Sequence, residues 1–470
     1  MIFSTIEFFT FFAVVFPTAL LLRNTRYFHF YLLLASCYFY MSWNPAFIFL
    51  LFASALIDYL AAPKIMEASS QRTKKQWLVV AMGLNLGLLG FFKYANFFAN
   101  GINWACDRWF QIPHLNVTLP VGISFYTFQS MSYSLDAYFG KITRERSFIK
   151  FALYVSFFPQ LVAGPIVRAQ EFLPQLYRSL TVSLDNIKHG LQRFVIGLVK
   201  KLLIADALAP YVDRIFANPA QYDAATLWLG ALAFGIQIYC DFSGYSDMAI
   251  GTAKCFGYVF PENFNMPYFA TNIRAFWQRW HMTLSRWLRD YLFIPLGGSW
   301  CSESMIVRNL MITMLLGGLW HGADWRFVIW GGLHGGYLVL YRTWANIKRR
   351  TNLATRIPIK KLTAVISACI TFFVVTLTWV YFRAADASVA TAMVRRMLMF
   401  DSTGEFVPSP LLMICLVVMF VSHLVATFAD HEALYRKLPT PFKVVGYGVI
   451  FYLISISSIQ DNTPFIYFQF

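Results

Sequence analysis

The chain has 470 residues, of which 58% are hydrophobic, 19% aromatic and only 13% charged, and its mean hydropathy is +0.53. This composition excludes a soluble globular protein and is typical of a polytopic membrane protein. The net charge of +16 would suggest nucleic-acid binding in a soluble chain. Here the Lys and Arg residues lie in short loops between apolar blocks, as the positive-inside rule requires, so we expect a lipid bilayer and no nucleic acid as partner.

Apolar blocks run along the whole chain, and no stretch between them is long enough to fold alone. We therefore expect an all-α protein with a single integral membrane domain over residues 1–470. The seven cysteines are scattered and never occur in C-x-x-C spacing. We interpret them as small buried hydrophobic residues, and we predict no metal site.

The first apolar block, residues 1–22, lacks a basic start and a small-residue cleavage site, and Arg23 and Arg26 follow it. We interpret it as a retained transmembrane helix whose C-terminal end lies in the cytoplasm. Four further crossings are predicted because basic loops alternate with apolar blocks, and the polar segment 96–118 is expected outside. These four blocks cover residues 27–43, 45–62, 77–92 and 119–139.

The basic clusters at 141–150 and 342–361 are both expected in the cytoplasm, so an even number of crossings should separate them. Five apolar blocks lie between them, at 151–166, 191–209, 227–250, 305–319 and 325–341. We expect the Pro- and Gly-bearing block 151–166 to be re-entrant, because irregular backbone at membrane depth must be buried in protein or line a wet cavity. Three later blocks, at about 362–382, 410–428 and 443–459, bring the total to roughly twelve crossings.

The segment 273–291 differs in kind, because its apolar residues recur at helical spacing while Arg274, Gln278, Arg279 and Arg289 occupy the other arc. This pattern predicts one amphipathic helix at the cytoplasmic boundary. There its arginines can meet anionic headgroups or a ligand that carries phosphate.

The stretch 315–336 places His321 and His334 in apolar sequence of membrane length. Ionisable groups at bilayer depth are expensive and tend to mark function, although an intramembrane histidine can also serve only to join helices. The glycine pairs around them are interpreted as close-packing points between helices, since no P-loop pattern surrounds them.

A series of motifs, in order along the chain, resembles the bacterial branch of the membrane-bound O-acyltransferase family. They include GISFYTFQSMSYSLDAY (122–138), FFPQLVAGPIVR (157–168), CDFSGYSDMAIG (240–251), ENFNMPY (262–268), FWQRWHMTLSRWLRDYLFIPLGG (276–298), RNLMITMLLGGLWHGADWRFVIWGGLHG (308–335) and PFIYFQF (464–470). The resemblance therefore covers most of the chain.

This resemblance implies an enzyme that moves an acyl group from a thioester to a hydroxyl, with His321 of the W-H-G motif as the essential residue and His281 as a second catalytic position. It also implies a ring of roughly eleven to thirteen tilted transmembrane helices, with re-entrant and interfacial segments, around a central catalytic tunnel. Asp324 departs from the pattern. A carboxylate there could alter the pKa of His321 or simply face a loop. The role of His334 stays open.

The chemistry of acyl transfer agrees with these positions. The reaction needs a base for the hydroxyl proton and hydrogen-bond donors for the developing oxyanion. We expect His321 to be the base, because neutral imidazole suits pH 7, and His281 or Asn309 to donate. A covalent acyl-enzyme is less favoured, since Ser243 has no obvious base beside it.

Further residues are predicted to bind the substrates. We expect Asn309, Trp320, Arg279 and Trp277 to contact the substrate, and Arg274 and Arg289 to bind the phosphates of the donor. Arg suits phosphate through its bidentate fork. The alternative for the arginines is that they only anchor the segment to anionic lipid.

Three functions are consistent with the sequence. The first is an O-acetyltransferase of the bacterial inner membrane that takes acetyl from cytoplasmic acetyl-CoA, with no bound prosthetic group. It would pass acetyl toward an alginate-like exopolysaccharide or peptidoglycan, directly or through a periplasmic acetyltransferase partner. The second is D-alanyl transfer from a carrier protein to teichoic acid. The third is a transporter whose intramembrane His and Asp residues relay protons.

Overall fold

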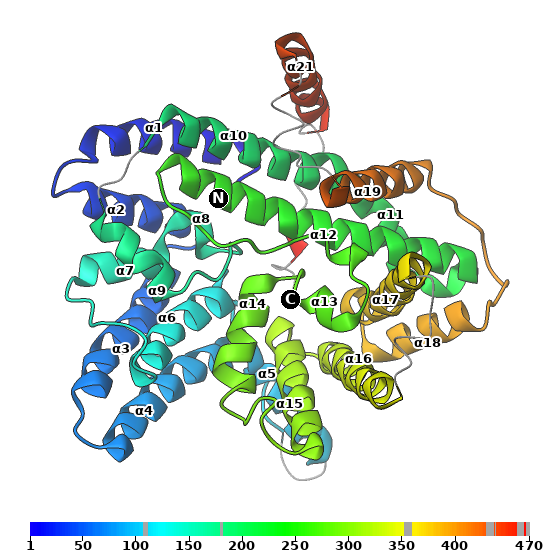
Figure 1. The fold of residues 1–470 in the computed structure, drawn as a ribbon, viewed down its shortest axis with the longest axis horizontal. Helices are drawn as coiled ribbons and strands as arrows, with labels where there is room; N and C mark the ends of the chain where they lie inside the picture. Colours follow the sequence, from blue (N-terminus) through cyan, green and yellow to red (C-terminus); the bar gives the residue numbers. More distant parts are fainter. Residues whose placement is uncertain are drawn as a thin grey trace. The chain divides into compact units, whose positions relative to one another are not determined.

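The computed structural model describes residues 1–106, 111–178, 182–351, 360–428, 437, 439–457 and 465–466 (Figure 1). Within these ranges the protein consists of helices and connecting loops, and an isolated bridge between Tyr222 and Glu405 is the only extended pairing in them. The prediction of an all-α protein is confirmed.

The chain divides into two compact units. The first unit comprises Met1–Ile196 and Tyr245–Glu262, and the second comprises Gly197–Gly244 and Asn263–Phe470. Two long helices, α10 (Leu184–Val199) and α12 (Ala224–Cys255), contribute residues to both units. The single membrane domain stays a prediction.

The helices of the first unit follow the predicted apolar blocks closely. They are α1 (Ile6–Leu22), α2 (Phe28–Met41), α3 (Phe47–Glu67), α4 (Gln71–Leu89), the π-helix η1 (Gly90–Tyr94), α5 (Ala95–Ala105), α6 (Ile123–Tyr138), α7 (Phe148–Ser156), α8 (Phe158–Leu161), α9 (Ala169–Phe172) and η2 (Leu173–Tyr177). One boundary was wrong. The fourth apolar block was expected over 77–92, but helix continues to Ala105 because the π-turn η1 joins α4 to α5 without a break. The location of segment 96–118 outside the membrane stays a prediction.

The predicted re-entrant block 151–166 contains a broken helix. The nine residues of α7 end at Ser156, and α8 adds only four. A nine-residue helix is about 14 Å long, less than half of the hydrocarbon thickness of a bilayer, so neither piece can cross alone. Re-entry itself stays a prediction.

The second unit contains the histidine motifs. After α10 its elements are η3 (Lys200–Ala205), α11 (Asp206–Ala217), η4 (Pro219–Gln221), α12, η5 (Pro267–Phe269), α13 (Ile273–Trp277), α14 (Met282–Leu288), η6 (Arg289–Phe293), α15 (Glu303–His321), α16 (Trp325–Arg350), α17 (Lys360–Arg383), α18 (Ala387–Leu398), α19 (Pro410–Phe428) and α21 (Thr440–Ser457). Its core is rich in aromatic residues, among them the fully buried Trp280, Trp330 and Trp379.

Apolar helices of membrane length occur in both units. Among the residues that the structure describes, four helical stretches are long and apolar enough to cross a bilayer: Phe47–Glu67, Gln71–Ala105, Ala224–Cys255 and Leu362–Arg383. Shorter apolar helices cover Ile6–Leu22, Phe28–Met41, Pro410–Val425 and Thr440–Ile456. These helices indicate a multi-pass membrane protein, whereas the total of about twelve crossings stays a prediction.

Candidate active site

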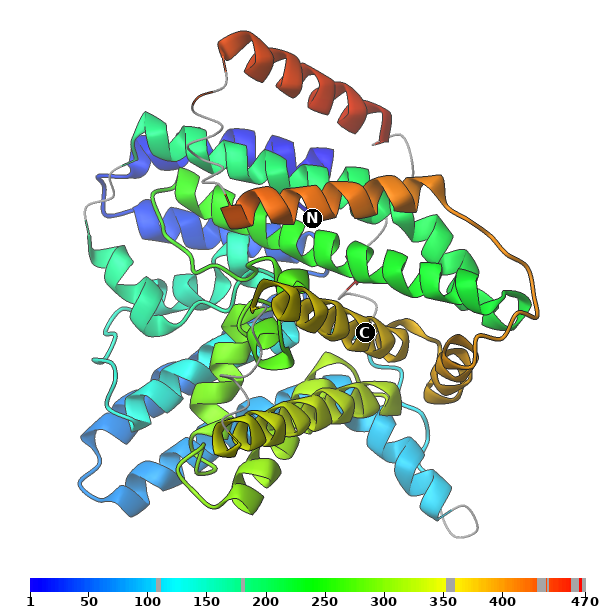
Figure 2. The same cartoon turned by 45° about the vertical axis from the view of Figure 1, so that its right-hand side comes forward.

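The helices α15 and α16 form an antiparallel pair that carries His321 and His334, and they lie side by side (Figure 1 and Figure 2). Their backbones touch where Gly318 meets Gly331. A β-carbon on Gly318 would collide with the carbonyl oxygen of Phe327, and one on Gly331 with that of Met314. The close-packing role predicted for these two glycines is confirmed.

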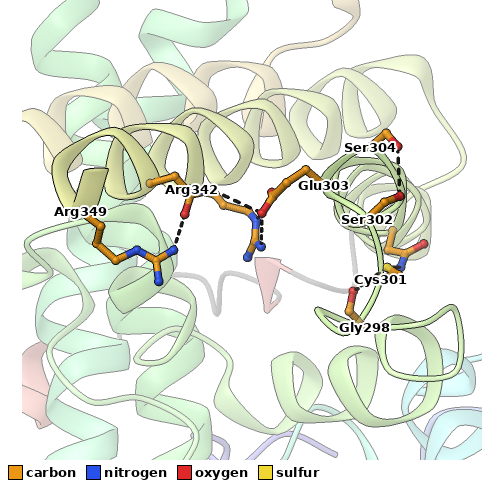
Figure 3. A network of polar contacts seen from close by, with 9 residues as sticks. Gly298, Cys301, Ser302, Glu303, Ser304, Arg342 and Arg349 are labelled. Atoms are coloured by element: carbon orange, nitrogen blue, oxygen red, sulfur yellow. Dashed lines mark hydrogen bonds and ion pairs between the residues drawn. The ribbon is translucent and has the colours of Figure 1, made fainter. Parts of the chain in front are cut away.

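Polar contacts hold both ends of this helix pair. At the turn, the Asp324 side chain caps α16 by accepting a hydrogen bond from the Arg326 N–H at 2.8 Å. At the other end, the guanidinium of Arg342 donates two hydrogen bonds, of 2.9 and 3.0 Å, to the carboxylate of Glu303 (Figure 3). Asp324 is thus explained as a helix cap, since a carboxylate satisfies the free N–H groups of a first turn.

His321 is the last residue of α15 and is only 5% exposed. Its imidazole is surrounded by aromatic rings, with centroids 5.0 Å away for Trp320, 5.0 Å for Trp330 and 5.2 Å for Phe382. This enclosure keeps bulk water away from the ring.

The region around His281 contradicts the single helix predicted for 273–291. His281 has φ of +40°, a left-handed conformation that ends the helical path between α13 and α14. Asn263 stabilises the break, because its Oδ1 accepts hydrogen bonds from the Thr283 N–H at 3.2 Å and the Thr283 hydroxyl at 2.9 Å. The apolar stripe is nevertheless buried as the pattern predicted, at Ile273, Phe276, Trp280, Leu284, Trp287, Leu288 and Tyr291.

The same amide sets the tautomer of His281. Its Nδ1 lies 3.1 Å from Asn263 Oδ1, an atom that can only accept, so Nδ1 carries the proton. Burial lowers the pKa of His281 to about 3, and the imidazole is neutral at pH 7. Its Nε2 therefore presents a lone pair. Such a ring suits a proton-accepting role better than the donor role considered from the sequence.

The three histidines are joined by two tryptophans. Trp320 lies between His281 and His321, with ring centroids 5.9 and 5.0 Å from them. Trp330 lies between His321 and His334, at 5.0 and 4.7 Å. The three histidines come from α15, α16 and the break between α13 and α14. The fold thus brings residues more than fifty positions apart in sequence into one aromatic group.

Of the predicted substrate-binding residues, Trp277 lies beside the histidines, whereas Asn309 does not. Trp277 is half-buried and contacts His334, with a centroid distance of 5.1 Å. Asn309 is fully buried, but it lies twelve residues before His321 on α15, which is about 18 Å along a helix. Its amide donates to the Gly298 carbonyl at 3.3 Å and its oxygen accepts from Arg308 at 2.9 Å. The structure therefore does not bring Asn309 together with the histidines.

The arginines of this segment do not share one helical arc, because the chain breaks at His281. Arg274 is exposed in the last turn of α13, and Arg279 is partly buried just before the break. Arg289 is exposed and pairs with its neighbour Asp290 at 2.6 Å. Of the three, Arg279 lies nearest in sequence to His281.

Two polar contacts of this region involve partners that the sequence did not identify. The first is the pairing of Asn263 with His281, for which the only signal was the position of Asn263 in the ENFNMPY motif. The second is a buried ion pair of 2.8 Å between Lys201 and Asp241. The other carboxylate oxygen of Asp241 accepts a hydrogen bond from the backbone N–H of Ile466 at 2.8 Å. The π-helix η3 contains Lys201, and the pair connects it to α12.

Known proteins share sequence similarity with this chain. The model of the membrane-bound O-acyltransferase family, MBOAT, matches residues 140–384. The chain is 38% identical to the probable alginate O-acetylase AlgI of Pseudomonas putida over the whole length of both proteins. It is 39% identical to the peptidoglycan O-acetyltransferase of Helicobacter pylori, over 80% of this chain and 74% of that protein.

A more distant similarity, of 29% identity, links it to the teichoic acid D-alanyltransferase of Bacillus subtilis, over 55% of this chain and 67% of the relative. The family match includes α13 to α16 and with them all three histidines. On these findings the chain belongs to the membrane-bound O-acyltransferase family and is an O-acyltransferase.

Proposed function

We propose that this protein is an O-acetyltransferase of the bacterial inner membrane. It takes acetyl from cytoplasmic acetyl-CoA and passes it toward hydroxyls of an extracytoplasmic polysaccharide, directly or through a periplasmic acetyltransferase. The observation that carries this proposal is the enclosed imidazole of His321, joined through Trp320 to the neutral imidazole of His281. Similarity to an alginate O-acetylase along the full chain supports acetyl as the group and a glycan as the acceptor.

In this proposal His321 is the general base. The acceptor oxygen forms a bond to the thioester carbonyl carbon while His321 takes the hydroxyl proton. The lone pair on His281 Nε2 orients the hydroxyl, and the indole of Trp320, between both imidazoles, is a candidate donor for the oxyanion. When the carbon–sulfur bond breaks, the thiolate takes the proton from His321, leaving an ester and a free thiol.

The donor side of the proposal rests on charge. Acetyl-CoA carries several phosphate charges and cannot enter lipid, so its nucleotide end needs cations at the membrane surface. Arg274 and Arg279 are side chains that can supply them. Arg289 is a weaker candidate, because Asp290 already neutralises part of its charge.

D-alanyl transfer to teichoic acid is the second candidate, since a teichoic acid D-alanyltransferase matches more than half of the chain. The higher identity and fuller coverage of the acetyltransferase relatives favour acetyl. The family match identifies an acyltransferase and so favours acyl transfer over proton transport.

Two measurements test the proposed function. Protein purified into nanodiscs should release free thiol from acetyl-CoA in the presence of de-O-acetylated glycan from the source cells, and not from a D-alanyl carrier protein. Mass spectrometry of exopolysaccharide and peptidoglycan, from cells with and without the gene, should show loss of O-acetyl groups. Unchanged acetylation in the deleted strain, with turnover of the D-alanyl carrier, would establish the second candidate instead.

A further inference from the structure

Four buried polar atoms around His334 have no hydrogen-bond partner among the residues that the structure describes. They are the indole nitrogens of Trp277, Trp330 and Trp379 and the Nδ1 of His334. His334, Trp330 and Trp379 are 0, 1 and 1% exposed, so bulk water does not reach them. We call these four residues the indole–imidazole cluster.

The cluster is contiguous and adjoins the proposed base. The ring centroids of Trp330 and His334 are 4.7 Å apart, those of Trp277 and His334 5.1 Å, and those of Trp330 and Trp379 6.0 Å. Trp330 also contacts His321 at 5.0 Å. The unpaired polar atoms therefore come from α13, α16 and α17, and they gather around the ring of Trp330. That ring contacts His321, the proposed base.

The hydrogen bonds of His334 define what it offers. Its Nε2 lies 3.0 Å from the hydroxyl oxygen of Thr378, and that hydroxyl donates its own proton to the Val375 carbonyl at 2.7 Å. Thr378 must then accept from the imidazole, so Nε2 carries the proton and Nδ1 presents a lone pair. The cluster thus combines three N–H donors with one acceptor.

Such atoms are costly to leave unpaired. A buried N–H without an acceptor costs about 1–3 kcal/mol, and folded proteins leave few of them. Trp228, a partly buried tryptophan of the same unit, shows the usual solution: its N–H donates to the Met397 carbonyl at 3.1 Å. Four unpaired atoms in one contiguous group are best explained by a ligand that both accepts and donates hydrogen bonds.

We propose that the indole–imidazole cluster binds a secondary amide of the thioester donor, the amide nearest to the sulfur. Its carbonyl oxygen accepts from the indole N–H of Trp330 or Trp379, and its N–H donates to His334 Nδ1. This inference rests on the proposed function, since the pantetheine arm of acetyl-CoA carries such an amide two carbons from the sulfur. When the thioester lies at His321, the amide is the next polar group along the arm. It would then lie beside Trp330, the ring that contacts both His321 and His334.

Binding without turnover tests the inference independently of the reaction. The ligands are S-acetyl-N-acetylcysteamine, which has the amide, and S-ethyl thioacetate, which lacks it. We expect the first to raise the melting temperature of the wild type in nanodiscs and the second to raise it much less, because a ligand stabilises the state that it binds. At least one of the variants Trp330→Phe and Trp379→Phe, which replace the indole by a smaller ring without an N–H, should lower the affinity for the amide ligand about 3- to 10-fold.

Trp228→Phe is the matched control. It should lower the melting temperature, because the Met397 carbonyl loses its donor, but leave the preference for the amide ligand unchanged. Trp330→Phe removes an unpaired N–H, so it should lower the melting temperature of the free protein only by the effect of the cavity that the smaller ring leaves. Equal binding of both ligands by the wild type, or an unchanged preference in Trp330→Phe and Trp379→Phe, overturns the inference. Failure of acetyl-CoA turnover by the wild type overturns the proposed function alone.

Discussion

Two groups of buried polar side chains in this protein are built in opposite ways. In the first unit, Asp58 is fully buried in α3, and its oxygens accept hydrogen bonds from Asn85 at 2.8 Å, Ser130 at 2.6 Å and Ser134. Ser54 in turn donates to the Asn85 oxygen at 2.7 Å. In the second unit, the indole–imidazole cluster leaves four polar atoms without partners among the described residues.

The difference separates structure from function. A carboxylate inside a helix bundle is tolerated when each of its oxygens has donors, and it then joins α3, α4 and α6. Unpaired donors stabilise nothing in the free protein, which is why we assign those near His321 to the binding of a ligand. Burial of a polar residue is therefore a weak sign of function, whereas a contiguous group of unpaired buried atoms beside the proposed base is a stronger one.

The largest effect on activity should come from His321, which contacts the indole–imidazole cluster. We expect His321→Ala to lower the rate of acetyl transfer by at least about 10²- to 10⁴-fold, because the base is removed. The protein should remain folded in the membrane, as judged by its melting temperature and elution volume. His423→Ala, a buried histidine of α19 outside the site, should retain activity. Comparable acetylation by His321→Ala at equal expression would contradict the assignment.

Substitution of Asp58 should have the reverse effect, because it should lower stability and leave activity unchanged. Asp58→Ala removes the carboxylate oxygens that accept from Asn85, Ser130 and Ser134, and we expect it to destabilise the protein by roughly 3 kcal/mol. Thermal unfolding should show this loss, while activity per folded molecule stays normal. Asp213→Ala removes an exposed carboxylate that pairs with Arg383, and it should cost less than about 1 kcal/mol. A catalytic defect in folded Asp58→Ala would remove the contrast between the two groups.

A pH profile can sharpen the comparison at His281. In the wild type this imidazole is neutral, because burial lowers its pKa to about 3, and its protonation should not affect activity between pH 5 and 8. Asn263→Asp places a carboxylate beside Nδ1 and raises the pKa of His281. Protonation as the pH falls then removes the Nε2 lone pair, so activity should decline about tenfold toward acid pH.

The matched control is Asn265→Asp, which adds the same charge at an exposed position of the same loop. Its pH profile should follow that of the wild type. If both variants show the same acid loss, the contact between Asn263 and His281 is not responsible.

The smallest effect is expected at the arginines. Arg279→Gln should raise the KM for acetyl-CoA several-fold with little change in kcat, because a phosphate contact is shared by the bound and transition states. Arg395→Gln, an exposed arginine of α18, should change neither constant. An unchanged KM in Arg279→Gln would instead support the lipid-anchor role.

Apolar length and motif order predicted most helices and singled out His281 and His321 as candidates, because both are local properties of the chain. Pairings across long separations could not be read in this way. The left-handed His281 that breaks segment 273–291 depends on Asn263, eighteen residues earlier. The satisfaction of Asp58 likewise depends on Ser130 and Ser134, which share one face of α6 at i, i+4 spacing but point to no partner by themselves.

The contact of Gly318 with Gly331 has a mechanical consequence. Since the two backbones touch there, no side chains lie between them that could rearrange as a sliding layer. Packed elements of this kind shift as one body and do not deform continuously. His321 and His334 should then keep a fixed separation whenever the protein opens to admit or release a substrate. Any movement that opens the protein must then occur in other elements. The fixed distance between the proposed base and the indole–imidazole cluster would select donors whose thioester and amide are separated by the matching length.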